Sequence, residues 1–240
     1  MKQIIYNDYS ELSAKTAEMI AAIINDKPDA LLCFPAGETS VGTFKCLIDL
    51  NKSGRISFKE CRIVGLDEWA HIGKMKNENG FSFMRKHLFD HIDYSNENLC
   101  FFDGESTDLS NECVKTDDFI RKYGPVDMML LGIGMNGHLG LNEPGTSFGL
   151  NAHIAKLDET TKIVGKKYFS ADVELSRGIT LGIKDIMDAK TVILQINGSR
   201  KAEIAKKLFD SEVTTAFPAS VLKEHKNSFV ILESEAAGLL

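Results

Sequence analysis

Short apolar runs alternate with amphipathic helical patterns along nearly the whole chain, and this alternation constrains the fold more than any other feature. The run VDMMLLG, residues 126–132, is apolar on both faces of a strand, which is typical of a strand buried in a parallel sheet. Similar runs predict strands at residues 30–34, 62–66, 99–102, 177–182, 191–196 and 228–232. We therefore predict an α/β fold with a doubly wound, mostly parallel, Rossmann-like sheet and helices on both faces.

Helical periodicity fills the segments between the expected strands. The first helix is expected to follow Ser10 as its cap, with an apolar stripe formed by Leu12, Met19, Ile20, Ile23 and Ile24. Further helices are expected at residues 40–50, 80–91, 111–122 and 199–209. No repeat, low-complexity tract or flexible linker interrupts this pattern, so we expect residues 1–240 to form a single domain.

The charge and the apolar content exclude several classes of protein. A net charge of −6, spread along the chain, argues against binding to nucleic acid or to an anionic membrane surface. No apolar run approaches the ~20 residues that span a bilayer, and the first residues are too acidic for a signal peptide. The five cysteines show no paired spacing, which indicates free thiols in a reducing compartment. We expect a cytoplasmic protein without nucleic-acid or membrane partners.

Polar or glycine-rich segments follow four of the expected strands. They are PAGETS at residues 35–40, DEW at 67–69, GIGMNGHLGLNEPG at 132–145 and NGSRK at 197–201. Ligands of open α/β sheets bind beyond the carboxyl ends of the strands, where such segments meet. The sequence therefore predicts one ligand site at this edge of the sheet.

The third of these segments contains a formal dinucleotide-binding fingerprint, G-x-G-x-x-G, formed by Gly132, Gly134 and Gly137. In such a fingerprint the last glycine opens a helix whose N-terminus faces the pyrophosphate. Here four more helix breakers follow within twelve residues: Gly140, Pro144, Gly145 and Gly149. We therefore reject a nucleotide cofactor, and we interpret His138 and Glu143 on this loop as a working pair of titratable groups.

The segment GIGMNGHLGLNEPGTS, with LDEW upstream and RGITLG, NGSRKAE and FPAS downstream, resembles the glucosamine-6-phosphate deaminase/isomerase family. The resemblance covers residues 10 to 230 and is closest to the galactosamine-6-phosphate isomerase branch. It implies conversion of galactosamine 6-phosphate or glucosamine 6-phosphate to tagatose or fructose 6-phosphate and ammonia. It also implies a sugar-phosphate ligand, no metal or other cofactor, and a monomer or small homo-oligomer.

The resemblance assigns the proton-transfer groups. It makes Asp67 the base that moves the C2 proton, His138 the ring-opening acid and base, and Glu143 the carboxylate that orients it. Asn136 stands where the glucosamine enzymes carry Asp, so we expect its amide oxygen to accept a proton from the imidazole. Glu143 is then the only obvious anion near His138. Two questions stay open: Asp67 could instead cap a helix, and the neighbouring Glu68 has no assigned role.

The resemblance also assigns a phosphate site. Gly37, Glu38 and Thr39 are expected to present it with a helix N-terminus, with the Glu38 side chain pointing away from the anion. Lys201 matches the family's phosphate lysine, and Lys167 falls where the glucosamine enzymes place an arginine. The alternative for Lys167 is an ordinary basic helix face. Two loop glycines that are expected to contact the substrate complete the set: Gly134 and Gly137.

Two other functions are compatible with parts of these motifs. A 6-phosphogluconolactonase has a similar G-x-G-x-x-G-H loop, but a Phe-Pro segment without the acid replaces Asn142-Glu143-Pro144. A non-catalytic sugar-phosphate sensor would carry a helical DNA-binding module and would lack the acid and the histidine. Since Asp67, His138 and Glu143 are all present, we predict an aminosugar-phosphate isomerase and deaminase.

Overall fold

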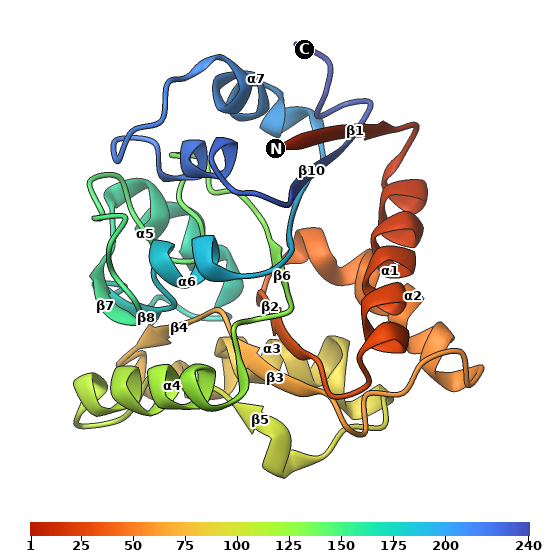
Figure 1. Ribbon diagram of the computed structural model, residues 1–240. Helices are drawn as coiled ribbons and strands as arrows, with labels where there is room; N and C mark the ends of the chain where they lie inside the picture. The colour runs from red at the N-terminus through yellow and green to blue at the C-terminus, as the bar shows by residue number, and fades with distance from the viewer.

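The computed structural model describes the backbone of residues 1–240 and the side chains of residues 1–73 and 76–240. Its centre is a seven-stranded sheet in which every neighbouring pair is parallel (Figure 1). The strand order is β1 (Lys2–Tyr6), β10 (Ser228–Glu233), β9 (Val192–Ile196), β6 (Met128–Leu131), β2 (Leu31–Phe34), β3 (Arg62–Gly65) and β5 (Leu99–Cys100). The predicted doubly wound α/β fold is confirmed.

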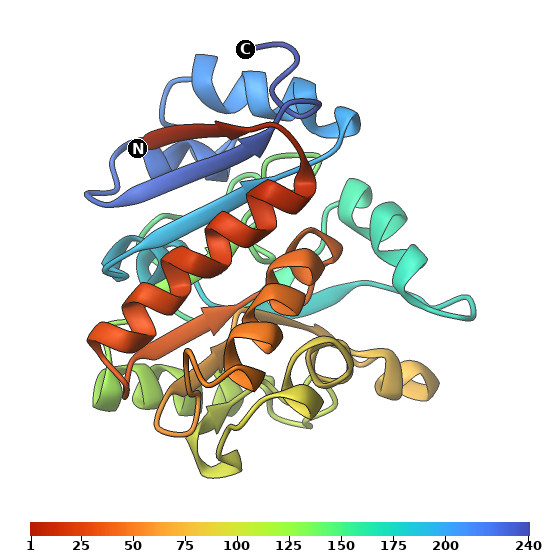
Figure 2. The ribbon, with the colours of Figure 1, turned by 90° about the vertical axis from the view of Figure 1, so that its right-hand side faces the viewer.

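Helices cover both faces of this sheet, as Figures 1 and 2 show. One face carries α1 (Tyr9–Asp26), α2 (Val41–Lys52) and α3 (Gly80–His87), and the other carries α4 (Leu109–Tyr123), α6 (Ile183–Asp188) and α7 (Ala202–Asp210). Alternate side chains of the central strands enter opposite cores, which is why β2 and β6 are apolar throughout. In β2, Leu31 and Cys33 face one core while Leu32 and Phe34 face the other.

A second, three-stranded antiparallel sheet lies beside the main one. Its order is β4 (Asp67–Ala70), β8 (Arg177–Thr180) and β7 (His153–Lys156). The strand predicted at residues 177–182 therefore forms here and not in the parallel sheet, and DEW belongs to a strand and not to a loop. Leu66 joins the two sheets, since its carbonyl accepts from the Leu181 N–H at 2.8 Å. This connection places Asp67 directly beyond the end of β3.

Several predicted boundaries change in the structure. Asp8, and not Ser10, caps α1, because its side chain accepts from the Glu11 N–H at 2.8 Å. The edge strand β1 was not expected from the sequence, and a helix near α5 (Glu159–Gly165) was considered only as the alternative for Lys167. Residues 134–152 contain no helix, which confirms the rejection of a dinucleotide-type crossover helix. The connections include short 3-10 helices: η1 (Glu38–Ser40), η2 (Gly73–Glu78), η3 (Phe89–His91), η4 (Asn96–Asn98), η5 (Lys166–Tyr168), η6 (Ser199–Lys201) and η7 (Pro218–Lys223).

Three observations bear on what the composition led us to expect of the cysteines, of membrane-spanning helices and of metal sites. The five cysteines are free thiols and four of them are buried. No helix among the described residues has the length and apolar character needed to cross a membrane. Within the same residues, no cluster of three or more His, Cys, Asp or Glu side chains is placed to hold a metal ion.

Candidate active site

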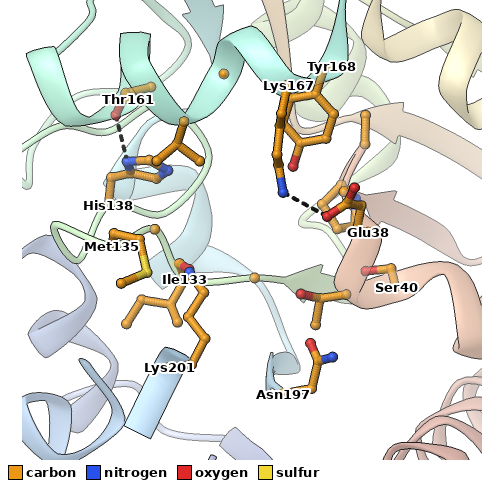
Figure 3. A pocket seen from close by; sticks show the side chains of 18 of the residues that line it. Glu38, Ser40, Ile133, Met135, His138, Thr161, Lys167, Tyr168, Asn197 and Lys201 are labelled. Atoms are coloured by element: carbon orange, nitrogen blue, oxygen red, sulfur yellow. Dashed lines mark hydrogen bonds and ion pairs between the residues drawn. The ribbon is translucent and has the colours of Figure 1, made fainter. Parts of the chain in front are cut away.

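A cavity of about 530 Å³ opens at the carboxyl ends of the main-sheet strands (Figure 3). All four predicted segments contribute to its wall, through residues 35–40, Asp67 and Trp69, residues 132–135 and residues 197–201. The segment formed by α5 and η5 adds further lining residues: Thr160, Thr161, Val164, Gly165, Lys167 and Tyr168. The predicted convergence of the four segments on one site is therefore confirmed.

The turn between β2 and α2 forms one end of the cavity. Gly37, Glu38 and Thr39 all line it, immediately before the N-terminus of α2. The Tyr9 hydroxyl fixes this turn from α1, because it donates to the Thr39 carbonyl at 2.9 Å and accepts from the Gly42 N–H at 2.8 Å. Helix N-termini favour anions, so this end of the cavity suits a phosphate group.

Two lysines face the same end. The Lys201 amino group donates to the Ile133 carbonyl at 2.5 Å, and burial, together with the charge of Lys167, lowers its pKa to about 8. Lys167 lies in η5 and lines the cavity, so its ammonium is not part of an ordinary helix face. Both cations lie where an incoming anion would meet them.

Glu38 occupies a position that the sequence did not predict. Its carboxylate does not point away from the phosphate end but pairs with Lys167, with 2.7 Å between Oε2 and Nζ (Figure 3). The two side chains are 65% and 47% exposed. The expectation for Glu38 is corrected: an isolated carboxylate could turn to solvent, but one beside an unpaired ammonium is attracted to it.

Asp67 lines the cavity from β4. It caps no helix, so the alternative role considered for it does not apply. Burial raises the pKa of its carboxyl to about 7, and the negative charge of Glu68 acts in the same direction. A carboxyl with a pKa near neutrality is suited to accept and return a proton.

Glu68 faces the opposite side of β4, because neighbouring strand residues alternate. Its side chain is 3% exposed. The carboxylate accepts from the backbone N–H groups of Trp69 at 2.8 Å, Gly80 at 2.9 Å and Phe81 at 3.1 Å. It therefore ties β4 to the start of α3 and does not line the cavity, which answers the question left open by the sequence.

The glycine-rich loop after β6 makes room for His138. A Cβ atom at Gly134 would lie 2.4 Å from the imidazole ring, so this position admits only glycine if the ring is to stay in place. Gly137 has a φ of 87° and packs against Phe217, where a Cβ would lie 2.2 Å from the phenyl ring. Gly134 lines the cavity, whereas Gly137 forms the turn behind it.

The His138 imidazole is held through its Nδ1 atom. This nitrogen lies 3.4 Å from Oε2 of Glu143. It also lies 3.1 Å from Oγ1 of Thr161, the contact drawn in Figure 3. Burial alone would raise the pKa of the Glu143 carboxyl, but hydrogen bonds from His138, Thr161 and Asn136 lower it below its ordinary value. The ionised carboxylate fixes the ring and leaves Nε2 available to a ligand in the cavity.

The expected contact between Asn136 and the imidazole is wrong. The Asn136 oxygen accepts from the His138 backbone N–H at 3.2 Å, and its amide nitrogen donates to Glu143 Oε2 at 2.8 Å. The same nitrogen donates to Asp158 Oδ1 at 3.3 Å. A short amide side chain two residues before the histidine reaches its backbone more easily than its ring. Glu143 is also not the only anion of this network, since Asp158 belongs to it.

Sequence reasoning missed residues that act across long separations. Thr161 and Asp158 lie on or next to α5, about twenty residues after the groups that they contact, and Arg200 and Tyr9 also line the cavity. The signal for α5 was present, because Asp158-Glu159 is a typical helix start with a capping acid and a first-turn acid. Of the predicted site residues, Asn136, Glu143 and Gly137 lie behind the cavity wall and the others line it.

Comparisons with known proteins agree on one family. A family model described as glucosamine-6-phosphate isomerases/6-phosphogluconolactonase matches residues 8–231. The glucosamine-6-phosphate deaminase of Bacillus pumilus (strain SAFR-032) is 38% identical over 240 residues, which cover 100% of both chains. Glucosamine-6-phosphate deaminase 1 of Bacillus subtilis (strain 168) is 37% identical over 240 residues, covering 100% of this chain and 99% of the other.

Solved structures extend the similarity to three dimensions. The structure of a monomeric glucosamine-6-phosphate deaminase superimposes with a TM-score of 0.96 at 36% identity and covers 100% of both chains. The 6-phosphogluconolactonase of Trypanosoma brucei has a TM-score of 0.74 at 18% identity, covering 100% of this chain and 98% of that one. The second similarity is one of fold alone.

Proposed function

Because this chain belongs to the family of glucosamine-6-phosphate isomerases and 6-phosphogluconolactonases, we propose that it catalyses the isomerising deamination of a 6-phospho-2-amino-2-deoxyhexose. The products are a ketohexose 6-phosphate and ammonia. Full-length relatives that carry the name glucosamine-6-phosphate deaminase support this activity. The chain is therefore an enzyme of aminosugar-phosphate metabolism.

The proton-transfer groups have complementary tasks in this proposal. The imidazole of His138 moves the proton that opens the sugar ring, with Glu143 holding the ring in orientation. Asp67 then takes the C2 proton and returns it at C1, while an amine proton ends on the former carbonyl oxygen, which converts the ring-opened amino-aldose into a C2 imine. Addition of water to the imine carbon releases ammonia and leaves the C2 ketone. A carboxyl whose pKa is raised to about 7 can both accept and release this proton near neutral pH.

The phosphate group binds at the other end of the cavity. We assign it to the turn formed by Gly37 and Thr39, with Lys201 and Lys167 as cationic partners. Lys167 must exchange its contact with Glu38 for the phosphate. This exchange is feasible because an exposed ion pair contributes only about 0.2–1 kcal/mol.

The observation that carries the proposal is that the proton-transfer groups and the proposed phosphate-binding groups line one cavity. Asp67 and His138 line the same space as Lys167, Lys201 and the turn before α2. A substrate held by its phosphate at one end would present its ring to a carboxylate and an imidazole at the other. Enolisation of this kind needs a base and an acid but no nucleotide.

The test is an ammonia-release assay on glucosamine 6-phosphate and galactosamine 6-phosphate side by side, with 6-phosphogluconolactone as a third substrate. We expect ammonia and a ketohexose 6-phosphate in equal amounts from at least one aminosugar. Hydrolysis of the lactone without ammonia release from either aminosugar would contradict the proposal.

The preferred epimer at C4 is a finer question. The relatives named above are glucosamine-6-phosphate deaminases, which favours the gluco substrate. The motifs LDEW and NGHLGLNEPG, with Asn136 in place of an aspartate, favour the galacto substrate. We propose the galactosamine branch as a second candidate, and a higher kcat/KM on galactosamine 6-phosphate in the same assay would support it.

Three further proposals concern the molecule as a whole. A monomer is our proposed state, because the similar solved structure is that of a monomeric deaminase. Sedimentation at micromolar concentration tests this, and a dimer would contradict it. A single domain spanning residues 1–240 and a cytoplasmic location stay predictions.

A further inference from the structure

Asn136 links two carboxylates that come from different parts of the fold. Its amide nitrogen lies 2.8 Å from Glu143 Oε2 and 3.3 Å from Asp158 Oδ1, while its oxygen accepts from the His138 N–H. Because both carboxylates can only accept and the backbone N–H can only donate, the orientation of the amide follows from its partners. Asn136 is thus a neutral bridge between two anions.

Asp158 is held in place independently of this bridge. It is the N-cap of α5, where its Oδ1 atom accepts from the Thr160 N–H at 2.9 Å. Hydrogen bonds from Thr160 and then from Asn136, together with the charge of the nearby His138, lower the pKa of the Asp158 carboxyl. Its charge is therefore present at neutral pH. On the same helix, Thr161 contacts the imidazole directly.

We propose that Asp158 is a positioning residue of the proton-transfer unit formed by His138, Glu143 and Asn136. Through the Asn136 amide it holds the Glu143 carboxylate against His138 and adds a second negative charge behind the imidazole. The inference rests on the proposed function for the catalytic role of His138, but the geometry of the network does not depend on it. The role follows from the neutral residue at position 136: an amide cannot supply charge, whereas the aspartate bound to it can.

Other charged groups also face the imidazole and enter the test. Glu143 contacts it from its own loop, and Asp158 acts from the N-terminus of α5. The remaining charged side chains that line the shared cavity are Glu38, Asp67, Lys167, Arg200, Lys201 and Glu235. A substitution at Asp158 leaves all of them unchanged, so it isolates one contribution.

The experiment is an NMR titration of His138 in the substrate-free protein, with its signal assigned by loss in His138→Gln. Asp158→Asn keeps an oxygen for the α5 cap and for the Asn136 contact but removes the charge. We expect the His138 signal to titrate at lower pH than in the parent, because the loss of a nearby anion disfavours imidazolium. Glu159→Gln is the matched control. It removes a negative charge from the next residue along the chain, and the Glu159 side chain is 81% exposed. It should leave the His138 pKa unchanged.

A pH profile of ammonia release on the same variants is the second measurement. With Asp158→Asn we expect the limb of the pH–rate profile that depends on the protonation of His138 to move to lower pH. We also expect kcat to fall several-fold and KM to stay unchanged. Equal His138 pKa values in Asp158→Asn and the parent, or equal shifts in both variants, would overturn the proposal. Because the NMR titration needs no turnover, a shift there without any ammonia release by the parent would overturn the proposed function but not the network.

Discussion

The two ends of the cavity are built in different ways. At the proton-transfer end, His138 is fixed by Glu143 and Thr161, which are 6% and 4% exposed. At the phosphate end, the contact between Lys167 and Glu38 is made by two side chains that are each about half exposed or more. One end is a partly buried hydrogen-bond network, and the other is a surface ion pair.

This difference indicates a division of tasks. Proton transfer requires groups that already stand in the reactive geometry, which a buried and mutually hydrogen-bonded set provides. Phosphate binding requires cations that can exchange partners, and a solvent-screened ion pair gives up its contact at little cost. Substitutions at the first end should therefore change kcat, and those at the second should change KM.

The largest effect is expected for Asp67→Asn. An amide cannot accept the C2 proton, so ammonia release should fall by roughly 10²- to 10⁴-fold with an unchanged melting temperature. In the parent, activity should decline as the pH falls through about 7, where the base becomes protonated. The control is Asp210→Asn, which makes the same change at a carboxyl that is 63% exposed on α7. Activity in Asp67→Asn close to that of this control would show that Asp67 is not the base and that this end of the cavity does not carry out proton transfer.

A smaller loss is expected for His138→Ala, on the order of 10²-fold on the cyclic aminosugar phosphate. Because the imidazole acts before enolisation, the same variant should regain most of its rate on a substrate analogue locked in the ring-opened form. The measurement is the ratio of kcat on the two substrates. An equal loss on both would move His138 to the proton transfer between C2 and C1.

Asn136→Asp adds a charge to this partly buried network and removes the hydrogen bonds that the amide nitrogen donates to Glu143 and Asp158. A third carboxylate beside Glu143 and Asp158 should stabilise the protonated form of His138, because added negative charge favours imidazolium. The limb of the pH–rate profile that follows His138 should then move to higher pH, opposite to the effect of Asp158→Asn. A profile that stays in place would show that the imidazole does not sense this network.

The smallest effect is expected at the phosphate end, from Glu38→Gln. Removal of the carboxylate frees Lys167, so KM should fall about two- to fivefold while kcat stays the same, in line with the worth of an exposed ion pair. Inhibition by inorganic phosphate should strengthen by a similar factor. Glu18→Gln, a change in a similar exposed ion pair on α1, serves as the control. A higher KM in Glu38→Gln would mean that the carboxylate itself binds the substrate.

Features that depend on neighbouring residues along the chain could be predicted from the sequence. Buried strands such as β6 are apolar on both faces, and a polar or glycine-rich segment follows each strand that ends at the cavity. The convergence of Asp67, His138 and Lys201 follows from the rule that parallel strands end at one edge. Short strands with mixed polarity, such as β4, carry too weak a pattern to be told from a loop.

Contacts between distant residues could not be predicted from local patterns. Lys167 and Glu38 are separated by 129 positions, and Asn136 and Asp158 by 22. An amide has two donors and one acceptor group, so the sequence alone cannot tell whether Asn136 faces the imidazole or the backbone of His138. The structure resolves this through the partners of the amide: its oxygen accepts from the His138 backbone N–H, and its nitrogen donates to Glu143 and Asp158.

The most direct test of the account follows the C2 hydrogen of the bound aminosugar phosphate in D₂O. We predict that the parent enzyme exchanges this hydrogen and places deuterium at C1 of the ketose, and that Asp67→Asn does neither at a measurable rate. In His138→Ala, exchange should persist with the ring-opened analogue. Exchange at the parent rate in Asp67→Asn would contradict the assignment of Asp67 as the base, and with it the proposed division of the cavity.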